Sequence, residues 1–384
     1  RDVERSRGLG DVYKRQRYNR PAHASLPSIP SCVCELVGYM VSATLIQSYE
    51  KLRESAGLVS LSNRGAINMK GSDCASYLQG LLTNDISGLT TGAGCYAAYL
   101  TPQGRMIADM RVLNLGDRLL LDVDSAMSDT LTSRFSMLVF SEDVQVNDES
   151  STWYWVGVRG PGAAACLEPI LRPERTLSGK KAVTAYQGLD NGWWVLDGKP
   201  VLAVSNDELG IPGIDLGVSS AYSGQINAQL EGLGLEWGSA GAVEALRVEA
   251  GTPRFGADMD EDTIPLEAGI EARAISETKG CYVGQEVIIR ILHRGKGRVA
   301  RRLVGLIFSQ DHTAESLSGQ SVYDGHETIG RVRSAISSPR LGRQIALAYV
   351  QRAYTAPGAR VEVADGERRV AAEVTELPFP PSLA

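Results

Sequence analysis

Residues 279–286 read Lys279-Gly280-Cys281-Tyr282-Val283-Gly284-Gln285-Glu286 and place one cysteine between two glycines. Glycines let the backbone turn sharply and approach another surface, and the residue spacing that follows predicts a short helix over residues 285–289. Free backbone N–H groups at a helix start, the helix dipole and a nearby lysine all favour a thiolate. On the residues alone, Cys281 is either a reactive thiol or a buried, inert cysteine, which is the commoner case.

The predicted secondary structure changes after this segment. Before it, the patterns predict helices and strands in mixed order: helices over residues 73–82, 125–138, 219–230 and 239–250, and strands over 110–113, 119–123 and 156–158. Ser72, Ser125 and Ser239 are the expected helix caps. Past Arg298, short alternating runs are separated by glycine, proline and aspartate, which predicts a Greek-key β-barrel. The fold class is therefore α+β with a C-terminal barrel.

The first 39 residues differ from the rest. They are rich in arginine, lack apolar periodicity and end in a proline-containing stretch, and they fit neither a secretory signal nor a transit peptide. Residues 7–16 also resemble a translated sequencing-adapter artefact. We therefore expect residues 1–39 to be a disordered or artefactual tail, with Met40 as the native start and a helix from there to Gly57. The Cys32-x-Cys34 pair gets little weight as a metal site.

Composition narrows the class of protein. The net charge of -6 over 384 residues argues against direct nucleic-acid binding, which needs a basic surface. The six cysteines show no disulfide rhythm, which favours a cytoplasmic location. No apolar run is long enough to span a membrane, and the four histidines are too dispersed to indicate a zinc site.

Five further motifs carry a resemblance that runs from about residue 45 to 379. They are Leu78-Gln79-Gly80-Leu81-Leu82-Thr83-Asn84-Asp85, Gly94-Cys95-Tyr96, Gly104-Arg105-Met106-Ile107-Ala108-Asp109, Leu246-Arg247-Val248-Glu249-Ala250-Gly251 and Pro265-Leu266-Glu267-Ala268-Gly269. Together with the K-G-C-Y-x-G-Q-E string at 279–286, they resemble the YgfZ/GcvT family of folate-binding proteins. These are relatives of the glycine-cleavage aminomethyltransferase (T-protein) that serve iron-sulfur cluster assembly.

The resemblance implies a fold, a cofactor and site residues. The fold is a three-lobed aminomethyltransferase-like one, with two interleaved α+β lobes over residues 40–297 and the barrel over 298–384. The cofactor is tetrahydrofolate or a one-carbon derivative. Cys281 and Asp109 are the implied catalytic residues, and Asp109 would act beside the reacting folate nitrogen. The implied cofactor-binding residues are Tyr96, Asn84, Asp109, Arg247 and Lys279.

Structural alternatives stand beside these roles. Asp109 could be a solvated or salt-bridged residue of a hairpin, and Tyr96 could belong to the core. Glu249 and Glu267 are expected to be structural carboxylates. The basic run after the cysteine motif is either a solvated face or an anion site for the glutamate tail of folate or for a partner's acidic surface. It comprises Arg290, His293, Arg294, Lys296, Arg298, Arg301 and Arg302.

Departures from the T-protein pattern decide the expected subfamily. Ile211 stands where T-proteins carry a pterin-binding glutamate, Val243 where they carry an arginine, and Ala108 where they carry the first of two acidic residues. Losing a charged hydrogen-bond partner removes about 1.5 to 3 kcal/mol. We therefore expect a YgfZ-type protein that supports iron-sulfur cluster assembly or repair, with assembly proteins or client enzymes as partners. The alternative is an aminomethyltransferase of the glycine cleavage system.

Overall fold

The computed structural model describes residues 31–173, 183, 187–295, 297–309 and 317–381, with side chains from residue 43 onward. The chain divides into two compact units, residues 1–42 and 43–384, and the sheets, the barrel and the candidate site all belong to the second. Residues 1–30 of the expected tail lie outside the described part. Helix α1 spans Ser31–Glu54, so it begins before Met40 and ends before Gly57.

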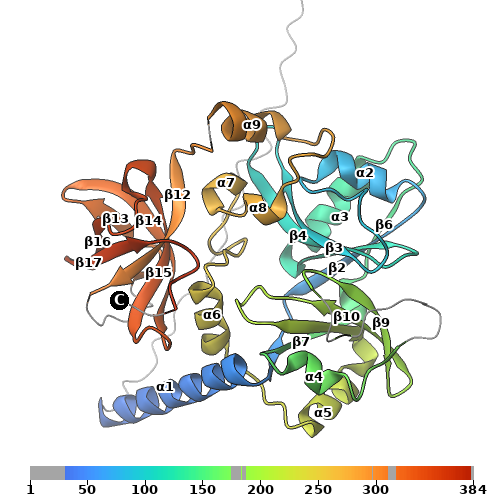
Figure 1. The fold of residues 1–384 in the computed structure, drawn as a ribbon, viewed down its shortest axis with the longest axis horizontal. Coiled ribbons are helices and arrows are strands. Elements are labelled where there is room, and N and C mark those ends of the chain that lie inside the picture. Colours follow the sequence, from blue (N-terminus) through green and yellow to red (C-terminus); the bar gives the residue numbers. More distant parts are fainter. Residues whose placement is uncertain (1–30, 174–182, 184–186, 296, 310–316, 382–384) are drawn as a thin grey trace, which may run out of the picture. The chain divides into compact units, whose positions relative to one another are not determined.

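A five-stranded antiparallel sheet forms the first lobe (Figure 1). Its strands, in spatial order, are β3 (Gly94–Leu100), β4 (Met106–Asn114), β5 (Leu119–Asp124), β2 (Arg64–Lys70) and β6 (Gln145–Asp148). Helices α2 (Cys74–Leu81) and α3 (Ser128–Met137) bury Leu78 and Phe135 in a core with this sheet. The strands predicted over residues 110–113 and 119–123 lie in β4 and β5, which pair antiparallel.

A six-stranded antiparallel sheet forms the second lobe. Its order is β1 (Gly57–Ser60), β7 (Trp153–Arg159), β11 (Gly213–Ser219), β10 (Lys199–Ser205), β9 (Asn191–Leu196) and β8 (Arg172–Pro173). Helices α4 (Ala163–Leu167) and α5 (Ser223–Gly232) accompany it. Strand β1 precedes the first sheet in the chain but pairs with β7, so the two sheets are interleaved in sequence.

The C-terminal strands close into a barrel, as the alternating pattern predicts. It is drawn in orange to red in Figure 1 and runs in the order β12 (Arg301–Phe308), β15 (Arg343–Gln351), β14 (Glu327–Ser338), β13 (Ser321–Asp324), β16 (Arg360–Asp365) and β17 (Arg368–Thr375). Small and β-branched residues such as Val332, Ala346 and Val363 fill its interior. The observed fold is the mixed α and β fold with a closed barrel that the sequence predicts.

Short helices connect the sheets to the barrel. These are α6 (Ala240–Glu249), α7 (Pro265–Ala268), α8 (Glu271–Ala274), α9 (Gln285–Ile289) and a π-helical turn (Arg290–Arg294). Single 3₁₀ turns lie at Ser125–Met127, Ser150–Thr152, Ser220–Tyr222 and Arg352–Tyr354.

One of the three predicted serine caps is confirmed. Ser239 accepts a hydrogen bond from the backbone N–H of Ala242. The hydroxyl of Ser72 bonds to the carboxylate of Asp143 instead, and Asp124 rather than Ser125 caps its turn. The partner of Ser72, Asp143, lies 71 residues away in the sequence, so the sequence does not reveal it. Asp124 directly precedes Ser125, and its carboxylate is a stronger acceptor for the backbone N–H of Ala126 than a hydroxyl would be.

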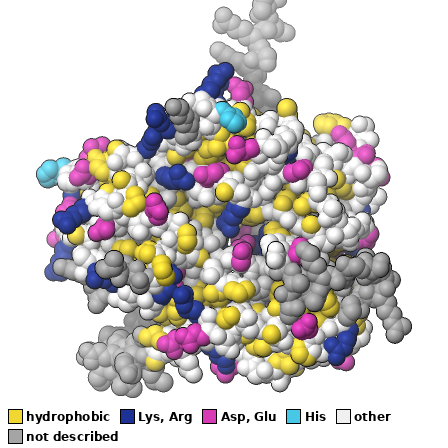
Figure 2. All heavy atoms as spheres, viewed as in Figure 1, with side chains coloured by type: hydrophobic (Ala, Val, Ile, Leu, Met, Phe, Trp, Pro, Cys, Tyr) yellow, Lys and Arg dark blue, Asp and Glu magenta, His cyan; other side chains and the backbone are white. Residues whose placement is uncertain are grey.

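The described surface shows mixed charge, free cysteines and neither a membrane-spanning helix nor a metal-binding cluster. On the face in Figure 2, acidic and basic side chains are interspersed. Within the described residues, no helix is both long and apolar enough to cross a membrane, and no cluster of acidic, histidine and cysteine side chains suits a metal ion. Cys74, Cys95, Cys166 and Cys281 are free thiols, while the side chains of Cys32 and Cys34 lie outside the description. A cytoplasmic location stays a prediction.

Candidate functional site

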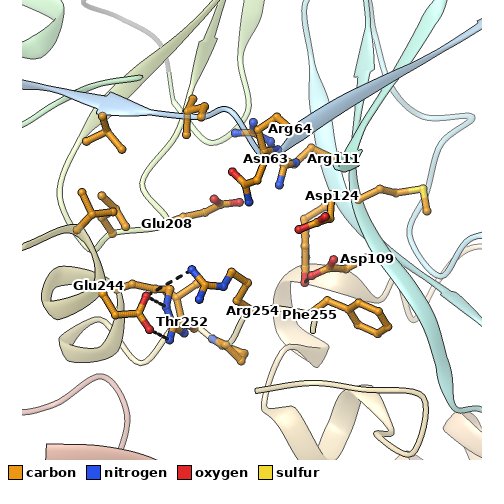
Figure 3. A pocket seen from close by; sticks show the side chains of 18 of the residues that line it. Asn63, Arg64, Asp109, Arg111, Asp124, Glu208, Glu244, Thr252, Arg254 and Phe255 are labelled. Carbon is orange, nitrogen blue, oxygen red and sulfur yellow. Dashed lines mark hydrogen bonds and ion pairs between the residues drawn. The ribbon is translucent and has the colours of Figure 1, made fainter. Parts of the chain in front are cut away.

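A cavity of about 190 Å³ lies between the five-stranded sheet, the loop after β10 and the segment after α6 (Figure 3). Its lining is strongly charged: six arginines and four carboxylates. The arginines are Arg64, Arg111, Arg159, Arg247, Arg254 and Arg273, and the carboxylates are Asp109, Asp124, Glu208 and Glu244. Positive charge therefore exceeds negative charge along the wall.

Tyr96 and Asp109 form the polar centre of the sheet wall. In the β3–β4 register Tyr96 lies opposite Arg111 and Ala98 opposite Asp109, so the tyrosine and the aspartate share one face of the sheet as diagonal neighbours. The Tyr96 hydroxyl donates to Asp109 Oδ2 at 2.6 Å. Burial raises the pKa of Asp109, although this hydrogen bond and Arg64 oppose the shift. A carboxyl group with a raised pKa suits proton transfer.

Glu208 faces Asp109 from the opposite wall of the cavity, as Figure 3 shows. It lies in the loop between β10 and β11, where its backbone N–H donates to Asn206 Oδ1 at 2.8 Å. Burial opposes ionisation of Glu208, but Arg111 and Arg64 outweigh it and lower the pKa. The cavity thus holds two carboxyl groups whose pKa values are shifted in opposite directions: that of Asp109 is raised and that of Glu208 is lowered.

Sequence reasoning missed Glu208. The residue before it, Asp207, is also acidic and is exposed to solvent. Nothing in the local sequence separates the two, because only the loop's path between the strands turns one carboxylate inward.

A buried chain of charges joins the two sheets behind the cavity. Arg64 and Arg111 each donate to Asp122 at 2.5 Å, and Arg111 also reaches Asp215 of the other sheet at 2.6 Å. Arg159 pairs with the second oxygen of Asp215. The three arginines are thereby held in fixed positions along the wall, and two of them, Arg111 and Arg64, lower the pKa of Glu208.

Asn84 and Lys279, both predicted to bind the cofactor, line neither this cavity nor the second one described below. Lys279 Nζ donates to the backbone oxygens of Gln79, Leu82 and Asn84 at 2.6, 2.5 and 2.9 Å. Asn84 Nδ2 in turn donates to the backbone oxygens of Tyr96 and Arg273 at 2.8 and 2.9 Å. In this structure the two residues hold cavity residues in place from behind; a direct contact with the cofactor stays a prediction.

Arg247 lines the cavity, yet its five N–H donors are all engaged by the protein. Nε and Nη2 grip the Glu244 carboxylate, Nη1 donates to Asp258 and to the backbone of Thr252, and Nη2 also donates to Ser334. The guanidinium fastens α6 to barrel strand β14, and a ligand would have to displace one of these acceptors.

Cys281 is exposed to solvent and lines neither cavity. Of the flanking glycines, Gly284 is the one that must lack a side chain: its φ is 84°, and a Cβ would lie 2.5 Å from the Thr101 backbone oxygen. Gly280 would meet nothing within 4 Å. The close backbone approach predicted for this motif is therefore confirmed at Gly284, where the motif packs on the β3–β4 turn.

The remaining predicted residues take structural positions. Glu249 accepts from the Tyr49 hydroxyl at 2.6 Å, and Glu267 pairs with Arg301 at 3.0 Å, so both are the structural carboxylates expected. Ile211 is 8% exposed and packs in a hydrophobic cluster. Of the basic run, Arg290 pairs with Glu286 on the surface, and Lys296 lies outside the described residues.

Comparison with known proteins identifies the family of this chain. Residues 16–277 match the GCVT N-terminal domain, and residues 301–380 match the glycine cleavage T-protein C-terminal barrel domain. The chain belongs to the glycine cleavage T-protein family. Two similar curated relatives are the aminomethyltransferases of Rubrobacter xylanophilus, 31% identical over 86% of this chain and 85% of the relative, and of Bacillus subtilis, 28% identical over 88% and 91%.

A solved structure supports the fold assignment within this family. The glycine cleavage system aminomethyltransferase T of Bartonella henselae superposes with a TM-score of 0.76 over 88% of this chain and 90% of that one, at 21% identity. The predicted GcvT-type folate-binding family is thus confirmed, and its known cofactor agrees with the tetrahydrofolate prediction. The YgfZ subfamily is not supported by these comparisons, which favour the aminomethyltransferase alternative.

Proposed function

We propose that this protein is a tetrahydrofolate-dependent aminomethyltransferase that binds the pterin ring in the Tyr96–Asp109 cavity. The observation that carries the proposal is the facing pair of Asp109, with its raised pKa, and Glu208, with its lowered one, in an arginine-lined hollow. The names of the curated relatives support the same reaction class.

The donor set suits a pterin. A pterin is flat, donates hydrogen bonds from its amino and ring N–H groups, and accepts at its carbonyl oxygen and ring nitrogens. The cavity offers carboxylates for the first kind of contact, arginines for the second, and the rings of Tyr96 and Phe255 for stacking. Its volume of about 190 Å³ is below the roughly 300–1,000 Å³ typical of small-molecule sites. It therefore suits the ring rather than the whole of folate.

The departures from the T-protein pattern do not remove this chemistry. Ile211 cannot accept a hydrogen bond, but the loop that holds it also carries Glu208, whose carboxylate lines the cavity. Val243 cannot bind an anion, but Arg254 and Arg273 line the same wall. The expected YgfZ-type assignment rested on three departures, at Ile211, Val243 and Ala108, and nearby residues compensate for the first two.

Asp109 would act as the general base. Tetrahydrofolate would supply the secondary amine that accepts the one-carbon unit. A carboxylate with a raised pKa can take the proton that this amine must lose, and the Tyr96 hydroxyl keeps the carboxylate oriented. The fixed charge of Glu208 stabilises positive charge that develops across the cavity.

The direct test is tetrahydrofolate-dependent turnover with an aminomethylated, lipoylated carrier protein. We expect release of ammonia in step with methylenetetrahydrofolate, and a loss of roughly 100-fold or more in Asp109→Asn, because general acid–base catalysis contributes about 10²–10⁴. The matched control is Asp207→Asn, since Asp207 is an exposed acid next to the cavity loop. Wild-type protein that is inactive with a carrier on which a known aminomethyltransferase works would refute the proposal.

One observation favours a second candidate, the YgfZ-type role in iron-sulfur cluster assembly. Cys281 is a solvent-accessible free thiol, and a thiolate is a soft metal ligand and a nucleophile. In a strain that depends on this chain, Cys281→Ser would then lower iron-sulfur enzyme activities while folate binding by the purified protein stays intact. Unchanged enzyme activities in that strain would remove the candidate.

A further inference from the structure

A second cavity, of about 620 Å³, lies on the outer face of the barrel. Its floor is formed by β15, β12, β17 and β16, which are neighbours in that order around the barrel. The segment after β17 closes one side with Pro380, and this segment is fixed because the backbone N–H of Phe379 donates to the backbone oxygen of Glu249 at 3.0 Å. No residue lines both this cavity and the first, so the two are separate hollows.

The register of the barrel places three ionisable side chains on this outer face. Ile307 of β12 lies opposite Glu373 of β17, and Glu373 lies opposite Arg360 of β16. On its other side Ile307 lies opposite Ile345 of β15, and Arg343 precedes Ile345 by two positions, so it shares the same face. The residues that alternate with these on β12, β17 and β16 fill the barrel interior. Two arginines therefore flank one glutamate across the cavity floor.

The three charged side chains of this cavity are free to meet a ligand. Arg360 and Glu373 are directly opposite each other, yet no ion pair joins them. On the same two strands Arg369 and Glu362 do form a pair, at 3.1 Å. Within the part of the chain that the structure describes, Arg343, Arg360 and Glu373 have no hydrogen-bond or ion-pair partner for their side chains. A ligand would thus displace no protein group from them.

The arrangement of charges selects a ligand that carries charge of both signs. A simple dianion would be repelled by the carboxylate of Glu373, and a cation would be repelled by two guanidinium groups. An α-amino acid with an acidic side chain has two carboxylates and one ammonium group, which complement two arginines and one glutamate. We propose that this cavity binds an α-amino dicarboxylic acid, with Arg343 and Arg360 on its two carboxylates and Glu373 on its ammonium group.

The size and the lining of the cavity agree with a small, flexible zwitterion. Its volume of about 620 Å³ lies within the roughly 300–1,000 Å³ typical of small-molecule sites. Strands β15 and β16 are three strand spacings apart, at most about 14 Å at about 4.8 Å for each spacing. Long arginine side chains on both sides can close on a ligand shorter than that distance. Ile307 and Pro380 offer apolar contact to its methylene groups.

The experiment is calorimetric titration of the full chain with L-glutamate, L-aspartate, glutarate, which lacks the ammonium group, and L-glutamine, which lacks the second carboxylate. We expect at least one of the two acidic amino acids to bind, and glutarate and L-glutamine to bind it more weakly by roughly tenfold or more. Arg343→Met and Arg360→Met should each weaken binding of the acidic amino acid by a similar factor. Glu373→Gln should also weaken it but should strengthen binding of glutarate, because the repulsion of a second anion is removed.

The matched controls are Arg368→Met and Glu367→Gln, which change exposed charges of the same barrel outside the cavity. Neither should change any Kd, and thermal unfolding of each variant checks that the fold is retained. If Arg368→Met weakens binding as much as Arg343→Met, the attraction is a general effect of surface charge and the assignment fails. Glutarate that binds as tightly as L-glutamate would remove the role of Glu373 and with it the proposed ligand class.

Wild-type protein that binds neither acidic amino acid would overturn the proposal. That result would leave the proposed function untouched, because the two cavities share no residue and the turnover assay uses none of these ligands.

Discussion

The hydroxyl oxygen of Tyr96 lies 2.6 Å from Oδ2 of Asp109, across neighbouring strands of one sheet. The hydrogen bond is stronger when the carboxylate is ionised than when it is protonated, so it lowers the pKa that burial has raised. If Asp109 is the base, the pH dependence of the rate follows the pKa that burial and this hydrogen bond set together.

Tyr96→Phe should therefore raise the pKa of Asp109 further. We expect the acidic limb of the pH profile of kcat/KM to move to higher pH. Tyr77→Phe is the matched control, because the Tyr77 hydroxyl bonds to the Phe135 backbone outside the cavity. An unshifted limb in Tyr96→Phe would mean that another group is the base.

Glu208→Gln should move the same limb in the opposite direction. The negative charge of Glu208 raises the pKa of Asp109, so removing it makes Asp109 ionise at lower pH. The same change should weaken binding of 6-methyltetrahydropterin by roughly tenfold, because a charged acceptor is lost. Asp207→Asn serves as the control, and a shift of the limb to higher pH would contradict the assigned charge of Glu208.

Asp215→Asn should destabilise the protein strongly. It leaves Arg111 and Arg159 as buried guanidinium groups without their shared carboxylate, a loss of about 3–5 kcal/mol in the free energy of unfolding. Asp262→Asn, which breaks an exposed pair with Arg105, should change it by about 1 kcal/mol or less. Denaturant unfolding measures both, and similar small effects would show that the chain of charges does not hold the two sheets together.

The pH dependence of this effect has a definite sign. Burial opposes ionisation of Asp215, but Arg159 and Arg111 outweigh it, and the pKa lies below the usual value of 3.8. The stabilisation is thus fully present above the unfolded-state pKa and is lost as the pH falls below about 4. The difference in unfolding free energy between wild type and Asp215→Asn should shrink in that window.

Lys279→Met should weaken folate binding although Lys279 lines neither cavity. Three backbone oxygens lose their donor, including that of Asn84, which holds the backbones of Tyr96 and Arg273. Burial lowers the pKa of Lys279 to about 8. A neutral amine has two donors for three acceptors, so wild-type affinity should decline as the pH rises through about 8 and the variant's should not.

The control for that experiment is Lys51→Met, which breaks a surface pair with Glu236. Calorimetry at pH 7 and pH 9 measures both variants. Equal affinity of Lys279→Met and wild type at pH 7 would show that the wall keeps its shape without this lysine.

The local elements could be predicted because their signals are local. Alternation past Arg298 marks the barrel strands, and the Ser239 cap with Gly251 marks the ends of α6. Tyr96 and Asp109 could be nominated from family motifs, and the sheet register brings them together. The sequence could not tell that Arg247 has no spare donor or that Lys279 and Asn84 work from behind the wall, because those facts depend on partners up to 200 residues away.

The sequence by itself therefore determined which segments form helices and strands, because the spacing of apolar residues is a local signal. It also supplied the residue types that can bind a folate. Tertiary structure alone decided which of these side chains meet. Glu208 and Asp207 are adjacent acids, yet one faces Asp109 across the cavity and the other faces solvent. The physical reason is that burial and charge at a site are sums over neighbours from distant segments, and these neighbours set which carboxyl group holds a proton and which arginine remains available for a ligand.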